Sequence, residues 1–226
     1  MSDDTIIEAP SPAWRLIPSR FPPIAAFEAV ARAGDLAAVM ELEGWTNDRL
    51  VAERVARLPQ DQWVYGTSNA SIVMASFLHA APAGSRFNGP DLGAWYAATT
   101  LTTAVAEVAH HLRREAMARG RLEERRTFRC HTCRLVGRDY RDIRGQQQSR
   151  AALYASTSYA ASQTFGKAVR AAGQSGIVYD SLRHRGGTNI VAFRPRQIVD
   201  VTQTDHYDLL VPVEGRIIAR KLRTGV

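Results

Sequence analysis

The chain has 226 residues, a length that suits one domain or two, and we favour one. Hydrophobic residues make up 45% and charged residues 23%, which excludes an intrinsically disordered chain. Two cysteines are too few for a disulfide framework. No apolar run approaches the ~20 residues of a membrane span, and the acidic start from Met1 to Glu8 lacks the basic segment of a secretory signal. We therefore expect a reduced, cytoplasmic protein with no membrane contact.

The positive charge comes almost entirely from arginine. Lysine and arginine number 29 against 22 acidic residues, a net charge of +7, and only Lys167 and Lys221 are lysines. Twelve arginines lie between Arg113 and Arg150, together with five acidic residues. Such a stretch can bind phosphate backbones, although a solvated face in an arginine-preferring chain explains it more simply. Because it holds only two aromatic residues and no finger, zipper or RNA-binding motif, we expect no direct contact with nucleic acid.

The N-terminal third predicts one strand followed by helices. Residues 1–12 are expected to form a flexible or extended lead-in, and residues 14–18 a short strand that ends at a proline. Apolar residues at helical spacing then predict a helical insertion over residues 22–80. Its helices are expected at residues 24–31, 36–42 and 49–58 and, after a cap at residues 67–69, up to Leu78.

The rest of the chain mixes strands and helices. After a loop over residues 82–90, a buried strand is expected at residues 94–98 and a helix capped by Thr99 or Thr100, with an apolar stripe from Leu101 to Leu112. Further expectations are an irregular polar stretch (119–150), a helix (151–172) ended by Gly173, strands at 176–181 and 189–193 joined by a glycine loop, and edge strands over 198–213. The order predicts an α+β fold: a single domain with a small mixed or antiparallel sheet flanked by helices.

Cys130 and Cys133 have half the spacing of a zinc site. A structural zinc needs four Cys or His ligands, and no second cysteine pair exists. Two buried or loop thiols are the simpler interpretation, and a redox role lacks the usual strand-to-helix context. We therefore expect no metal, and the role of the two cysteines stays open.

Three segments carry residues that suit chemistry. Ser181 follows Asp180 at a strand end, but no G-x-S-x-G elbow surrounds it, so a hydroxyl that bonds a ligand phosphate is favoured over a nucleophile. Arg86 lies between glycines, where a guanidinium and the backbone can approach a phosphate together, although the same pattern suits a plain turn. Glu107 lies about 120° from the apolar stripe of its helix, and periodicity alone favours a solvated position for it.

Taken in chain order, these segments resemble the RES domain family, which is named for its Arg, Glu and Ser. The likeness covers roughly residues 13–196. Its parts are Trp14-Arg-Leu16 as an opening strand, Gly84-Ser-Arg-Phe-Asn88 as a G-x-R-aromatic-N signature, Ala94-Trp-Tyr-Ala97 as an aromatic strand, Thr103-Ala-Val-Ala-Glu107 as the helix with the catalytic Glu, and Gly176-Ile-Val-Tyr-Asp-Ser181 with Asn189-Ile-Val-Ala-Phe193 as the closing strands.

The resemblance implies roles for individual residues. Members are bacterial toxins of type II toxin–antitoxin pairs, and they cleave the nicotinamide–ribose bond of NAD in an ADP-ribosyltransferase-like cleft. The catalytic domain would span residues 13–226, with Glu107, Arg86 and Ser181 catalytic. The NAD-binding residues would be Arg15, Arg86, Tyr96, Ser181 and Asn189, with support from Arg183. Arg15 and Arg86 are 71 residues apart, so Arg20 remains an alternative to Arg15 as the first arginine.

The resemblance also implies ligands and a partner. NAD would be a substrate rather than a redox cofactor, and no Rossmann fingerprint argues otherwise. ADP-ribose would pass to inorganic phosphate, as a co-substrate, or to water. The expected partner is a helical DNA-binding antitoxin that covers the NAD pocket in a hetero-oligomer. Two alternatives stay open: a protein ADP-ribosyltransferase toxin that uses the same site, and a non-catalytic basic module that binds nucleic acid.

Overall fold

The computed structural model describes residues 5–21, 27–30, 32, 35 and 57–223. One nine-stranded sheet runs through this part of the chain, in the order β1-β5-β6-β7-β3-β2-β4-β8-β9. Its strands are β1 (Thr5–Ile7), β2 (Ala13–Pro18), β3 (Trp95–Ala98), β4 (Glu123–Leu135), β5 (Tyr140–Asp142), β6 (Gly176–Asp180), β7 (Thr188–Ala192), β8 (Ile198–Pro212) and β9 (Ile218–Leu222). Only β5 and β6 pair in parallel among these strands, so the sheet is mixed.

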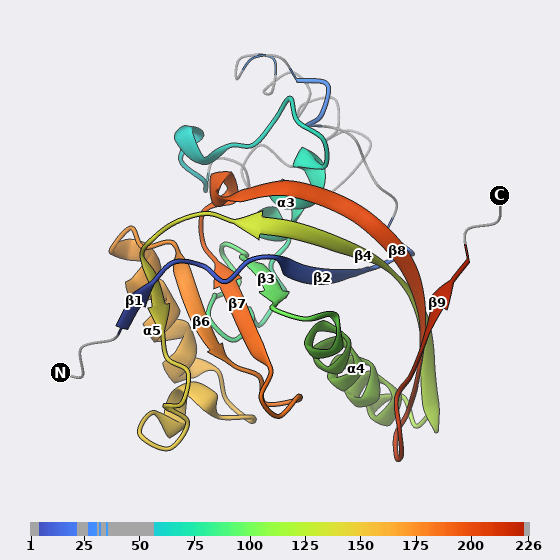
Figure 1. Cartoon of the computed structure of the whole chain (residues 1–226). Helices are drawn as coiled ribbons and strands as arrows, with labels where there is room; N and C mark the ends of the chain where they lie inside the picture. Colours follow the sequence, from blue (N-terminus) through green and yellow to red (C-terminus); the bar gives the residue numbers. More distant parts are fainter. Residues whose placement is uncertain (1–4, 22–26, 31, 33–34, 36–56, 224–226) are drawn as a thin grey trace.

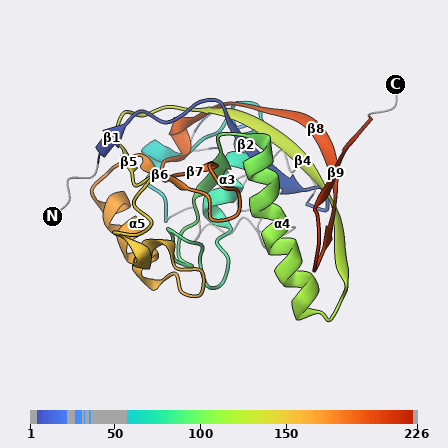
Figure 2. The ribbon, with the colours of Figure 1, turned by 60° about the horizontal axis from the view of Figure 1, so that its bottom comes forward.

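Helices cover both faces of the sheet. They are α3 (Ala70–Leu78), α4 (Leu101–Ala118) and α5 (Ala160–Ala171), with 3-10 turns at Gln60–Gln62, Ala151–Tyr154 and Pro195–Gln197. Figure 1 shows α3 and α4 on opposite sides of β2, β4 and β8, with α5 beside β6, and Figure 2 shows α4 along its length beside β4. The expected single α+β domain is therefore confirmed. No helix in the described ranges is both long and apolar enough to cross a membrane.

Strand alternation explains why two helices share the same strands. Successive side chains of a strand point to opposite faces, so β2 and β4 each supply two cores. Leu16, Phe128 and Cys130 pack in the cluster under α4. Ala13 and Cys133 pack in the cluster around α3. A third cluster joins α5 to β6 and β7.

The prediction of an irregular polar stretch over residues 119–150 is wrong. Residues 123–135 form β4, which pairs with β8 along its whole length, and residues 140–142 form β5. Three of the four arginines of β4 pair with acids of the strand itself or of neighbouring elements, as Arg125 does with Asp208 at 2.7 Å, and this pairing lets the strand hold them. Likewise, residues 198–212 form a single strand, β8, between β4 and β9, whereas several edge strands were expected over residues 198–213.

The structure also tests the expectations for the N-terminal segment and for the helices. Of the lead-in expected to be flexible or extended, residues 5–7 are extended, because β1 pairs with β5. The helix expected over residues 151–172 is broken between the 3-10 turn and α5, although Gly173 does follow the helix with φ 72°. The helices expected at 24–31, 36–42 and 49–58 lie wholly or largely outside the described residues, and residues 27–29 form a turn. Of the helical insertion predicted over 22–80, α3 falls within the described residues.

Candidate active site

A cleft of about 1140 Å³ opens beside α4. This volume lies just above the range of about 300–1,000 Å³ that is usual for small-molecule sites. Segments far apart in the sequence line it: β2, the 81–86 loop, β3, α4, residues 156–159 and the β6–β7 region. The predicted site residues on its wall are Arg15, Arg86, Tyr96, Glu107, Arg183 and Asn189.

Glu107 enters the cleft from the middle of α4. Thr100 caps this helix, and its side chain accepts a hydrogen bond from the backbone N–H of Thr103. The Oε1 atom of Glu107 accepts two hydrogen bonds of 2.6 Å, from Ser181 Oγ and from Asn189 Nδ2. Both donors are neutral, and within the described residues Oε2 has no hydrogen bond. The carboxylate is thus fixed through one oxygen, while the other remains available to a ligand.

Ser181 lies behind the carboxylate rather than on the cleft wall. Besides donating to Glu107, its Oγ accepts the backbone N–H groups of Arg183 (3.1 Å) and His184 (3.0 Å). The hydroxyl is therefore saturated by protein groups and only 6% of the residue is exposed. Its hydrogen bond to a ligand phosphate stays a prediction, whereas its contact with Glu107 was not anticipated.

The β6–β7 turn is pressed against the start of α4. His184 Nδ1 lies 2.8 Å from Thr103 Oγ1. Gly187 comes so close that a Cβ there would meet Thr103 Oγ1 at 2.7 Å, which explains why a glycine is needed. Because Ser181 precedes this turn and Asn189 follows it, the docking of the turn sets both donors against Glu107.

Arg15 is half-buried in the wall of the cleft. Its guanidinium stacks on Trp95 at 4.5 Å, and Nη1 donates to the carbonyl oxygen of Tyr96 at 3.0 Å. Burial lowers its pKa to about 10, so the side chain stays charged at neutral pH. Arg20 is exposed, stacks on Phe21 and does not line the cleft. The placement favours Arg15 over Arg20 as the first arginine.

Arg86 stands on the opposite wall. Its Nη1 donates to the carbonyl oxygens of Leu153 and Ala155, both at 3.0 Å, and its guanidinium lies 4.9 Å from the ring of Tyr159. The turn before it needs Gly84, which has φ 71° and whose Cβ would clash with a backbone carbonyl. Two carbonyls and a ring therefore hold one guanidinium.

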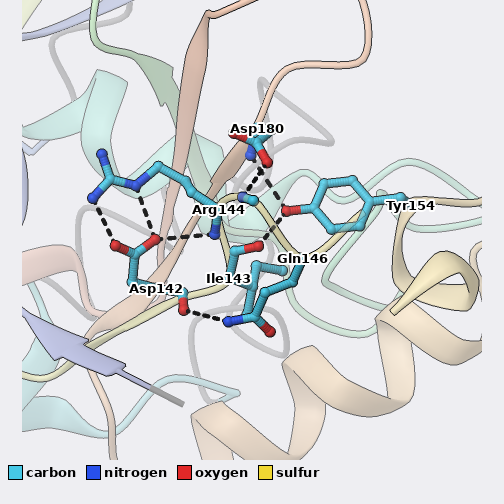
Figure 3. Close-up of polar contacts among 7 residues, drawn as sticks. Asp142, Ile143, Arg144, Gln146, Tyr154 and Asp180 are labelled. Atoms are coloured by element: carbon cyan, nitrogen blue, oxygen red, sulfur yellow. Dashed lines mark hydrogen bonds and ion pairs between the residues drawn. The ribbon is translucent and has the colours of Figure 1, made fainter. Parts of the chain in front are cut away.

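Tyr154, between the two carbonyls that bind Arg86, is itself anchored. Figure 3 shows its hydroxyl donating to the carbonyl oxygen of Ile143 at 2.7 Å and accepting the N–H of Asp180 at 3.4 Å. Asp180 also accepts a hydrogen bond from Gly145 N (2.7 Å), next to the ion pair of Arg144 with Asp142 (2.6 Å). This network ties the 3-10 turn to the ends of β5 and β6.

Tyr96 lines the cleft but uses its hydroxyl to shape the arginine loop. The hydroxyl donates to Asn88 Oδ1 at 2.8 Å and accepts the N–H of Phe87 at 3.0 Å. Burial raises the pKa of this phenol well above its ordinary value, so it stays protonated. Stacking on a dinucleotide ring remains a prediction for Tyr96.

Four cleft residues were not singled out as site residues. His111 and Arg114 follow Glu107 at helical spacing, which is the signal that could have indicated them. His110 also lines the cleft, and burial, together with Arg183, lowers its pKa to about 4. Tyr159, under Arg86, lies in a loop with no pattern that could have pointed to it.

Two alternatives from the sequence find little support. Cys130 and Cys133 are buried free thiols, and burial raises the pKa of Cys133 to about 11. No group of three potential metal ligands occurs among the described residues. In the arginine-rich stretch, at least seven of the twelve arginines pair with carboxylates of the described residues, which reduces the charge available to a phosphate backbone.

Comparison with known proteins identifies the family. A search of curated proteins gives no match. Among solved structures, the chain is similar to one from the M. tuberculosis MbcT–MbcA toxin–antitoxin complex, with 14% identity, coverage of 90% of this chain and 86% of the other, and a TM-score of 0.48. The model of the RES domain matches residues 53–211. This match covers most of the chain, including Arg86, Glu107, Ser181 and Asn189. The chain belongs to the RES domain family.

Proposed function

We propose that the protein is a toxin that cleaves the bond between nicotinamide and ribose in NAD and passes ADP-ribose to phosphate or water. The observation that carries this proposal is the position of Glu107. Its carboxylate is held by neutral donors in a cleft that four arginines line, namely Arg15, Arg86, Arg114 and Arg183. One fixed carboxylate among four guanidiniums suits a ligand that carries negative phosphates and develops one positive charge during the reaction.

The chemistry follows from the charges. Nicotinamide is cationic in NAD and leaves as a neutral molecule with the electron pair of the broken C–N bond, so no general acid is needed. The barrier lies in the oxocarbenium-like ribose that forms, as in glycoside cleavage. Glu107 would stabilise this positive charge and accept a hydrogen bond from a ribose hydroxyl through Oε2. An oxygen of phosphate or water then forms the new bond to the same carbon, and for water the surplus proton leaves to solvent.

The arginines would bind the pyrophosphate. A guanidinium presents donors in a geometry that matches phosphate oxygens. Arg86 is held rigidly by two carbonyls and Tyr159, so it loses little conformational freedom when a phosphate binds. Asn189 and Ser181 act through the carboxylate that they orient. This assignment makes both of them positioning residues.

A toxin needs a neutralising partner. By resemblance to the family, this partner would be a small helical DNA-binding antitoxin that covers the cleft. The net charge of +7 suits a partner surface that is acidic where it meets the toxin. Mixing the purified toxin with its purified antitoxin should then stop NAD consumption. Substitutions in the cleft of the toxin should weaken binding of the antitoxin.

The direct test is to incubate the purified protein with NAD, with and without inorganic phosphate, and identify the products. ADP-ribose 1-phosphate indicates phosphorolysis, and ADP-ribose with equal nicotinamide indicates hydrolysis. Label from adenine-labelled NAD that remains on protein indicates a protein ADP-ribosyltransferase instead. Intact NAD, under conditions in which the protein is folded, would refute the proposal.

A further inference from the structure

A second cavity of about 490 Å³ adjoins the Glu107 cleft. The two share five residues in their walls, namely Arg15, Leu16, Ala81, Ser85 and Tyr96. Much of the remaining wall is apolar and comes from the end of β2, the following turn and α3. Among the polar residues of this wall is Arg129, which enters the cavity from β4 and takes no part in the cleft.

Arg129 is buried with most of its hydrogen-bonding capacity unused. The residue is 5% exposed, and its Nη2 donates to the carbonyl oxygen of Phe21. Its Nε and Nη1 are buried and have no hydrogen-bond partner in the described part of the chain. These two atoms carry three of the five N–H donors of a guanidinium. Buried donors are normally satisfied, so this side chain points to a missing acceptor.

Arg15 adds a second positive charge on the same face of the sheet. In the β2–β4 register, Arg15 lies opposite His131 and Ile17 lies opposite Arg129. Arg15 and Arg129 are therefore diagonal neighbours whose side chains leave the sheet on one side. The Nε of Arg15 is also buried without a partner in the described residues. Burial lowers the pKa of both arginines, to about 10 for Arg15, yet both remain protonated at neutral pH.

No carboxylate among the described residues forms an ion pair with either arginine. Glu28 comes near the cavity wall, but both of its oxygens accept hydrogen bonds from Ser71, at the start of α3. His131 is fully buried, and its pKa is lowered to about 4 by burial and then by Arg129 and Arg15, so it is neutral. Buried guanidinium donors without an acceptor or a counter-charge are costly unless an anion joins them.

We propose that this second cavity is an oxyanion site in which Arg129 and Arg15 bind a phosphate group. A phosphate has enough acceptor oxygens for the unused donors of both arginines, and the two negative charges of inorganic phosphate or of a pyrophosphate balance the two cations. The phosphate is either free inorganic phosphate or part of a nucleotide that reaches past Arg15. The inference goes beyond the proposed reaction, because the site can fill whether or not NAD is cleaved.

The test follows the arginine Nε–H resonances by NMR while inorganic phosphate is added at constant ionic strength, with chloride as the balancing salt. The resonances of Arg129 and Arg15 should shift together along one saturable curve. A second titration uses NAD in phosphate-free buffer. A response to phosphate identifies the free anion as the ligand, and a response to NAD alone identifies a nucleotide phosphate.

Variants assign the site. Arg129→Met keeps a long apolar side chain and should weaken phosphate binding at Arg15 by about tenfold or more, because charge-assisted hydrogen bonds are lost. Arg125→Met lies on the same strand, where Arg125 is exposed and paired with Asp208, and should change the affinity by less than about twofold. Arg129 does not line the Glu107 cleft, whereas Arg86 does. A shift of the Arg86 resonance alone would therefore indicate phosphate binding in the cleft and not in the second cavity.

The proposal is overturned if neither phosphate nor NAD shifts the Arg129 resonance, if chloride shifts it equally, or if only Arg86 responds. The titration of the unchanged protein requires no variant to fold. Loss of NAD cleavage with the Arg129 shift intact would refute the proposed function alone, and the reverse result would refute this inference alone.

Discussion

Glu107 and Glu115 both belong to α4, about two turns apart. The partners of Glu115 are positively charged, and those of Glu107 are neutral. Glu115 contacts Arg119 at 2.7 Å and Arg126 at 3.0 Å, and Glu124 joins the same cluster through Arg121 and Arg126. Glu107 is bound by a serine and an amide. A carboxylate paired with guanidiniums is neutralised and supports the fold. A carboxylate held by neutral donors keeps its charge and can act on a ligand.

The strongest test of this contrast is Glu107→Gln. The amide keeps the shape but loses the charge, and removal of one preorganised electrostatic contact typically costs about 10²–10³ in rate. We expect NAD cleavage to fall by at least that factor, measured as product release, with the melting temperature within a few degrees of the original. Glu115→Gln on the same helix is the matched control and should leave the rate within about twofold. Equal rates for the two variants would remove Glu107 from the mechanism.

The variant Glu124→Gln should have the opposite effect, on stability rather than on rate. The side chain of Glu124 is 8% exposed and that of Arg126 is 14% exposed, so this pair is shielded from water. Weakening it should lower the free energy of unfolding by about 1–2 kcal/mol in urea titrations, while the rate per folded molecule is unchanged. A fall in rate without a fall in stability would contradict the contrast between Glu107 and the arginine-paired Glu115 and Glu124.

A smaller effect is expected at the support of Arg86. Tyr154→Phe removes the hydroxyl that joins the 3-10 turn to Ile143, so Arg86 is less firmly held. The KM for NAD should rise about threefold with kcat nearly constant, because Arg86 would bind ground and transition states alike. Tyr140→Phe is the control, since its buried hydroxyl has no partner among the described residues and its loss should not harm stability. A change in kcat alone would contradict this role for Tyr154.

The last expectation concerns pH. His131 is fully buried and its pKa is about 4 in the folded chain, against about 6.5 when unfolded. The unfolded state therefore binds more protons between these values. The stability linked to His131 is complete above pH 6.5 and falls as the pH drops toward 4, by at most about 1.4 kcal/mol per pH unit. His131→Leu should flatten the pH dependence of unfolding in this window, and an unchanged slope would contradict the assignment.

Local patterns in the sequence predicted much of the fold. The apolar stripe and threonine cap of α4 depend on neighbours within a few residues, and both are present. The strand β4 was missed because its acceptance of charged residues depends on β8, more than 60 residues later. For the same reason, the sequence indicates Ser181 as a site residue but not its hydrogen bond to Glu107. Its contact with Glu107 spans 74 residues and leaves no local signal.

The strand order has a consequence for synthesis on the ribosome. β2 pairs with β4, more than 100 residues later, and β1 pairs with β5. The donors that orient Glu107 lie at positions 181 and 189. Since contacts of such long range form late and slowly, Glu107 stays without its two donors through most of translation. The carboxylate is therefore oriented only when most of the chain has been made.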